Sequence, residues 1–174
     1  MIQDEISAIV LDPGYSTTRA GFAGEDTPKS VVPSYYGVTD SDDPTARRLF
    51  DDNVIHTPLP NLDIRNPMST DGLVEDWDTA GKLWEYAITS RLTGKRHKSA
   101  IRNTALKDEQ DGDVHMEDVE KNEKPLAHTP LLMTEPGWNT TKNREKAIEL
   151  AFEDWGALAF WMGRSGVLSS YVET

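Results

Sequence analysis

The chain has 174 residues, 30 of them acidic and 18 basic, and its formal net charge of −12 argues against a broad electrostatic attraction to nucleic acid or anionic lipid and favours basic partners. It contains no cysteine, which excludes disulfides, thiolate catalysis and cysteine-based metal sites. No apolar run approaches the roughly 20 residues that a membrane span needs, and the acidic start is unlike a secretory signal, so we expect a soluble intracellular protein without membrane contact.

The first predicted element is a β-hairpin over residues 6–22. An apolar run ends at Asp12, a Pro-Gly turn follows with hydroxyl residues after it, and a second run leads back. On one interpretation this is simply favourable turn chemistry. On the other, turn N–H groups and the hydroxyls of Ser16, Thr17 and Thr18 bind an anion, while Asp12 orients a hydrated cation.

A third strand is predicted at Val31 and Val32, with Pro33 ending it, which gives an antiparallel three-stranded meander. The first strand is apolar almost throughout, as is typical of a strand that is covered on both faces.

Residues 38–68 are polar and rich in proline, and they hold too few apolar side chains for a core of their own. We therefore expect a small inserted subdomain between two parts of one core, residues 1–37 and 69–174. The basic pair Arg47 and Arg48 is interpreted as a solvated turn.

Two helices and two more strands are predicted in the second part of the core. Asp76 is a suitable N-cap for the first helix, and Thr140 or Thr141 for the second. Strands are expected over residues 130–134 and 157–162, with a turn after the latter at 163–166. The buried stripe of the first helix comprises Trp77, Ala80, Gly81, Trp84, Ala87, Ile88 and Leu92. The apolar side of the second comprises Ala147, Ile148, Leu150, Ala151, Phe152 and Trp155.

Residues 95–125 interrupt this order with an acidic stretch that has no sustained apolar period. Its low hydrophobicity predicts a disordered surface insertion. Asp111, Asp113 and Glu117 do not meet the spacing of a calcium loop. Attraction of basic histone tails to this stretch is a further hypothesis. The order of the remaining elements predicts an α/β domain with a mixed sheet and flanking helices.

Several segments together resemble the actin family, and they follow one another in the family's order. They are Asp12-Pro13-Gly14 with Arg19-Ala20-Gly21-Phe22-Ala23-Gly24, Gly72-Leu73-Val74 with Asp76-Trp77-Asp78 and Trp84, and Leu131-Leu132-Met133-Thr134-Glu135-Pro136 with Asn143-Arg144-Glu145-Lys146. Tyr15-Ser16-Thr17-Thr18 and Thr134-Glu135-Pro136-Gly137-Trp138-Asn139 are most similar to a nuclear actin-related subfamily. Chromatin remodellers and a histone acetyltransferase complex share that subfamily, which pairs with actin on a helical segment of a large scaffold subunit.

The resemblance implies the actin-like ATPase fold, an RNase H-like mixed sheet with flanking helices, of which this chain holds the first lobe only. A fragment, a truncated gene model or one piece of a longer chain is therefore expected. It also implies a site for ATP and Mg²⁺. Carried over by position, Asp12 faces the metal through water, Gly14, Tyr15, Ser16 and Thr17 line the phosphates, and Arg19 replaces a phosphate-contacting lysine.

Three departures from the family pattern argue against hydrolysis. Pro13 has no N–H, Tyr15 stands where actin has a small serine, and Ser165 aligns with the glutamine that positions the attacking water. Because phosphoryl transfer depends on positioning and electrostatics, we expect nucleotide binding with little or no turnover.

The leading hypothesis is therefore a non-enzymatic, ATP-binding scaffold subunit of nuclear chromatin-remodelling and histone acetyltransferase complexes. Its expected partners are actin, a helical scaffold segment and histones, without sequence-specific nucleic acid. One alternative is an active ATPase or phosphotransferase of the actin, sugar kinase and chaperone fold group. The other is an acidic histone-interaction module without nucleotide.

Overall fold

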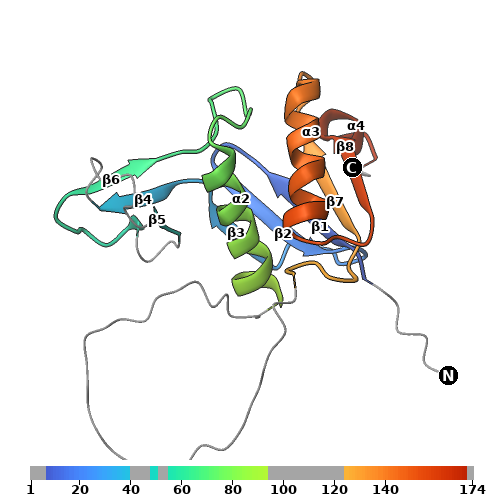
Figure 1. Cartoon of the computed structure of the whole chain (residues 1–174), viewed down its shortest axis with the longest axis horizontal. Coiled ribbons are helices and arrows are strands. Elements are labelled where there is room, and N and C mark those ends of the chain that lie inside the picture. The colour runs from blue at the N-terminus through green and yellow to red at the C-terminus, as the bar shows by residue number, and fades with distance from the viewer. Residues whose placement is uncertain (1–6, 40–47, 51–54, 94–123, 172–174) are drawn as a thin grey trace, which may run out of the picture.

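The computed structural model describes residues 7–39, 48–50, 55–93 and 124–171, and its strands form two sheets (Figure 1). The strands of the larger sheet are β1 (Ile9–Pro13), β2 (Thr17–Phe22), β3 (Ser30–Pro33), β7 (Leu131–Glu135) and β8 (Phe160–Arg164). They lie in the order β3-β2-β1-β7-β8.

The larger sheet is mixed. β2 pairs antiparallel with β1 and with β3, which confirms the predicted meander. β7 pairs parallel with β1 and with β8. The carboxyl ends of β1, β7 and β8 therefore lie at one edge of the sheet, where ligands of α/β proteins commonly bind.

Two helices accompany this sheet, and both begin at the predicted caps. They are α2 (Trp77–Tyr86), with the π-helical continuation Ala87–Thr93, and α3 (Thr141–Glu149), with the π-helical continuation Leu150–Asp154. The Asp76 carboxylate accepts from the Thr79 N–H at 3.1 Å, and the Thr140 hydroxyl oxygen accepts from the Asn143 N–H at 3.2 Å. These bonds satisfy N–H groups of the first helical turn, which have no carbonyl partner within the helix.

Both helices pack on the same face of the sheet. The buried cluster there includes Ile9, Leu11, Ala20, Leu131 and Met133 from the sheet and Ala80, Leu83, Trp84, Ile88, Ala147, Ala151 and Trp155 from the helical segments. The other face, which we call the open face, leaves Val31 48% and Trp161 55% exposed. In the first strand, Val10 on this face is only half-buried between the buried Ile9 and Leu11, so within the described residues the prediction that this strand is covered on both faces is wrong.

A second, small sheet consists of β4 (Tyr36–Thr39), β5 (Arg48–Leu49) and β6 (Leu62–Arg65), in the order β5-β4-β6. Arg48 is not a solvated turn residue, because its guanidinium pairs with the Asp78 carboxylate at 2.7 Å near the start of α2. Arg47 lies outside the described residues. The boundaries 38–68 of the inserted subdomain stay a prediction.

The last predicted strand begins too early. The Ala157 N–H donates to the Ala151 carbonyl at 2.9 Å and the Leu158 N–H to the Thr129 carbonyl at 3.1 Å, so these residues close the preceding connection. Pairing with β7 begins only at Phe160. The predicted turn at 163–166 is also wrong, since β8 is followed directly by the short helix α4 (Ser165–Ser169).

The acidic insertion 95–125 and the rejected calcium candidates Asp111, Asp113 and Glu117 lie outside the described residues, apart from Lys124 and Pro125. Leu126, immediately after them, is fully buried. Among the described residues, no helix has both the length and the apolar character that crossing a bilayer requires.

Candidate functional site

Asp12 lies at the carboxyl end of β1, on the open face. One carboxylate oxygen accepts from the Thr134 hydroxyl at 2.5 Å, and the other from the Arg19 guanidinium at 3.4 Å. Thr134 was not among the predicted site residues. It reaches Asp12 because β7 runs parallel to β1 with Met133 opposite Leu11, so the next residues of the two strands are neighbours.

Arg19 faces Asp12 directly across β1 and β2. The two side chains are 50% and 42% exposed, and ion pairs with such exposure contribute little to stability. The guanidinium can therefore turn toward an incoming anion at small cost.

The loop between β1 and β2 closes on itself. The Gly14 N–H donates to the Thr17 carbonyl at 3.1 Å. A Cβ at Gly14 would lie 2.7 Å from that same carbonyl oxygen, so the close approach requires glycine.

The next carbonyls of the loop are all bonded to residues outside it. The Ser34 hydroxyl donates to the Gly14 carbonyl at 2.5 Å, the Asn66 amide to the Tyr15 carbonyl at 2.8 Å, and the Ser34 N–H to the Ser16 carbonyl at 3.0 Å. The N–H groups of Tyr15 and Ser16 have no partner in the part of the chain that the structure describes. Because N–H and C=O point in opposite directions in a trans peptide, these two N–H groups point away from Ser34 and Asn66.

The Tyr15 ring packs edge-on against Tyr35, with ring centroids 6.0 Å apart and planes at 72°. Hydrogen bonding and charge interaction with Tyr35 raise the pKa of Tyr15 above its ordinary value. Tyr15 is therefore neutral at physiological pH and does not repel an anion.

The three candidate hydroxyls differ in accessibility. Ser16 is exposed and Thr17 is half-buried. Thr18 is fully buried, with its hydroxyl 3.0 Å from that of Ser34. The prediction that Thr18 contributes to anion binding is therefore wrong, because alternation along β2 turns it to the helix-covered face.

Asp12 is the acidic side chain at the carboxyl end of β1, beside the loop. The described residues hold no cluster of three or more side chains that could bind a metal ion. A single carboxylate fits Mg²⁺, which commonly keeps several waters and shares its remaining positions with substrate phosphates. A single carboxylate does not provide enough ligands for a cation that is bound by protein groups alone.

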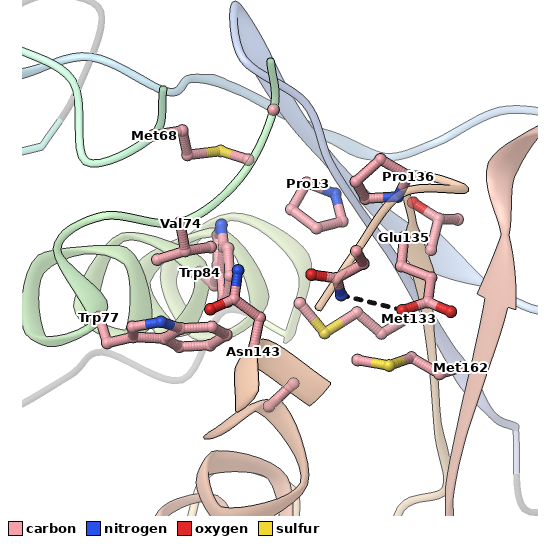
Figure 2. Close-up of a pocket in the computed structure, with 14 residues that line it drawn as sticks. Pro13, Met68, Val74, Trp77, Trp84, Met133, Glu135, Pro136, Asn143 and Met162 are labelled. Carbon is pink, nitrogen blue, oxygen red and sulfur yellow. Dashed lines mark hydrogen bonds between the residues drawn. The ribbon is translucent and has the colours of Figure 1, made fainter. Parts of the chain in front are cut away.

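A small pocket lies behind this edge, between the two helices and the sheet (Figure 2). It is lined by Pro13, Met68, Gly72, Val74, Trp77, Trp84, Met133, Thr134, Glu135, Pro136, Asn139, Asn143, Ala147 and Met162. Glu135, 5% exposed, accepts from the Asn139 amide at 2.9 Å and from two Arg144 nitrogens at 2.8 and 2.5 Å. These bonds fix the β7–α3 connection immediately after Thr134.

Comparison with known families decides the relationship of the chain. The family model described as Actin matches residues 3–174. The chain belongs to the actin family. Membership confirms the family resemblance and the actin-like α/β fold of a single lobe.

This actin-family chain is 58% identical over 170 residues to actin-related protein 4 of Emericella nidulans, covering 97% of the chain and 36% of the relative. It is 49% identical over 176 residues to actin-related protein 4 of Gibberella zeae, covering 97% and 37%. It is 28% identical over 171 residues to the Schizosaccharomyces pombe protein named SWI/SNF and RSC complexes subunit arp42, covering 98% and 33%. The chain thus spans about a third of the length of these relatives.

Ser165, which the family resemblance matches to the actin glutamine as a prediction, is the first residue of α4, directly after β8, and is exposed. It lies at the same carboxyl edge of the sheet as the loop after β1. The structure thus brings Asp12 and Arg19 together and places the predicted residues Gly14, Tyr15 and Ser16 in the loop beside them, with Thr17 at the start of β2. Their roles in binding nucleotide stay predictions.

Proposed function

We propose that this actin-family chain is the first, nucleotide-holding lobe of a non-catalytic subunit of nuclear chromatin-modifying complexes. The observation that carries the nucleotide site is the loop after β1. Its carbonyls are bonded to Ser34 and Asn66, while the N–H groups of Tyr15 and Ser16 have no partner among the residues that the structure describes. Such paired N–H donors form anion sites in many phosphate-binding loops.

These two N–H groups and the hydroxyls of Ser16 and Thr17 would donate hydrogen bonds to the phosphate groups of ATP. Arg19, half-exposed beside the loop, supplies a positive charge. Asp12 would hold a Mg²⁺ ion through the waters of that ion, and the ion would neutralise phosphate charge.

Weak or absent hydrolysis follows from the residues that replace the actin ones. Ser165 offers a short hydroxyl where actin has an extended amide that orients water, and Pro13 removes one N–H donor from the loop. Since this chemistry depends on positioning, both changes slow it. A nucleotide in this site therefore stabilises the fold and its assemblies.

The name of the Schizosaccharomyces pombe relative, a subunit of SWI/SNF and RSC complexes, supports a role in such complexes, and the relatives named actin-related protein 4 support an actin-related subunit. In such a complex the chain pairs with actin on a helical scaffold segment. The net charge of −12 favours basic partners, histones among them, over nucleic acid.

The decisive experiment uses the chain itself and a chimera in which it replaces the matching 36% of the Emericella nidulans relative. We expect the chimera to bind MgATP in calorimetric titrations and the chain alone to bind more weakly. Asp12→Asn should remove the Mg²⁺ dependence of binding, whereas Asp63→Asn on the distant strand β6 should not. Phosphate release at the rate of actin would instead establish the active ATPase alternative. If the chimera does not bind MgATP, the acidic histone-interaction module without nucleotide is the alternative that remains.

The assembly has its own test. The chimera, actin and a helical scaffold segment of a remodelling complex should co-elute as one ternary species from a sizing column. Separate elution at micromolar concentrations would contradict the proposed pairing.

A further inference from the structure

The chain segments that lead into and out of the small sheet both contact Tyr15. Tyr35, on the outgoing connection between β3 and β4, packs its ring edge-on against the Tyr15 ring. Asn66, on the returning connection after β6, donates its amide to the Tyr15 carbonyl at 2.8 Å. Residues distant in sequence thus fix one position of the candidate phosphate loop.

The orientation of the Asn66 amide is determined by its second bond. The Met68 N–H donates to the Asn66 side-chain oxygen at 2.9 Å. Met68 is 4% exposed and bridges to Val74, so this N–H has a fixed place. Because an N–H pairs only with the oxygen of the amide, the amide nitrogen faces Tyr15.

We propose that Asn66 is a positioning residue for phosphate binding, together with Ser34. Asn66 turns the Tyr15 carbonyl inward and thereby aims the Ser16 N–H outward. Ser34 does the same for the Gly14 carbonyl and the Tyr15 N–H. Neither side chain touches the phosphate. The choice of phosphate as the ligand rests on the proposed function, whereas the support of the loop by Asn66 does not.

The main test is Asn66→Asp. The aspartate keeps an acceptor for the Met68 N–H but loses the donor and places a negative oxygen against the Tyr15 carbonyl. We expect the chimera carrying it to bind MgATP about tenfold more weakly, and Asn66→Ala about fivefold more weakly, as the loss of one hydrogen bond predicts. Asp63→Asn, on strand β6 just before Asn66, should leave the affinity unchanged.

A second readout needs no nucleotide. The Gly14 and Ser34 N–H groups bond to carbonyls within the loop, so their hydrogen exchange in the 174-residue chain reports its order. In Asn66→Asp both should exchange several-fold faster, whereas the Met68 N–H stays protected. If Asn66→Asp does not fold, Asn66→Ala carries the same test without added charge.

The outcomes separate the two proposals. A wild-type chimera that does not bind MgATP ends the proposed nucleotide function, while exchange at Gly14 and Ser34 still tests Asn66. Exchange and affinity equal to those of Asp63→Asn would overturn the positioning role. Faster exchange with weaker binding would establish it.

Discussion

The buried carboxylate of Glu135 allows the cost of one substitution to be worked out bond by bond. Its side chain is 4% exposed and accepts three hydrogen bonds, two from Arg144 and one from Asn139. In Glu135→Gln, the least harmful orientation places the new NH₂ against one Arg144 nitrogen. Two bonds survive and one charge-assisted bond is lost, which costs about 1.5–3 kcal/mol. Because Arg144 is 36% exposed and water can reach the freed N–H, we expect about 2 kcal/mol.

The matched control is Glu149→Gln on α3, the helix that carries Arg144. Glu149 pairs with Lys146 at 2.5 Å, the same length as the shortest Glu135 bond, but both partners are about half-exposed, at 50% and 49%. An exposed pair of this kind should change stability by no more than about 0.5 kcal/mol. Urea unfolding at pH 7, followed by circular dichroism, gives both values. Equal losses in the two variants would refute the argument that burial sets the cost.

Three further substitutions and conditions test other parts of the fold. Gly14→Ala places a Cβ 2.7 Å from the Thr17 carbonyl oxygen and should lower the free energy of unfolding by about 1–3 kcal/mol, whereas Gly137→Ala, with open space around its Cβ, should be neutral in the same urea experiment. Asp76→Ala removes the N-cap of α2 and should cost about 1 kcal/mol, and an unchanged melting temperature would contradict the cap. Burial raises the pKa of Glu135, but hydrogen bonds and charges from its neighbours outweigh burial and lower that pKa overall. The lowered pKa stabilises the fold above the unfolded value of about 4.3 and this contribution is lost as pH falls through the folded pKa, so wild type should lose more stability on acidification than Glu135→Gln.

The parts of the fold that depend on local chemistry could be predicted from the sequence. The caps at Asp76 and Thr140 use side chains within three residues of the N–H groups that they satisfy. The loop after Asp12 follows from the Pro-Gly turn. The amphipathic stripe of α2 follows from its helical period. In each case the determining residues are neighbours along the chain.

The missed site residues depend on contacts between distant parts of the chain. Thr134 and Asp12 are 122 positions apart, and Asn66 and Tyr15 are 51 apart. Strand order alone brings the first pair together, since β7 adds in parallel beside β1. The second pair requires the return of the chain from the small sheet. Neither contact leaves a local pattern in the sequence.

Two other errors arise from interpreting apolar residues as buried. The run that begins at Ala157 reads as one strand, yet its first residues are bonded to Ala151 and Thr129, and pairing with β7 starts at Phe160. Ile148 and Phe152 suit the apolar side of a helix, but they remain 46% and 44% exposed. Hydrophobicity indicates that a side chain prefers burial. The residues that would cover that side chain lie elsewhere in the sequence, so the local pattern does not show whether it is buried.

The open face of the larger sheet also has an optical consequence. Trp84 and Trp155 are almost fully buried, whereas Trp161 and Trp138 are 55% and 67% exposed. A water-soluble quencher such as acrylamide therefore reaches the exposed indoles first. In Trp138→Phe, the accessible emission comes mainly from Trp161. Any chain that packs against the open face shifts this emission to the blue and protects it from the quencher, so the protein carries its own fluorescent reporter for that contact.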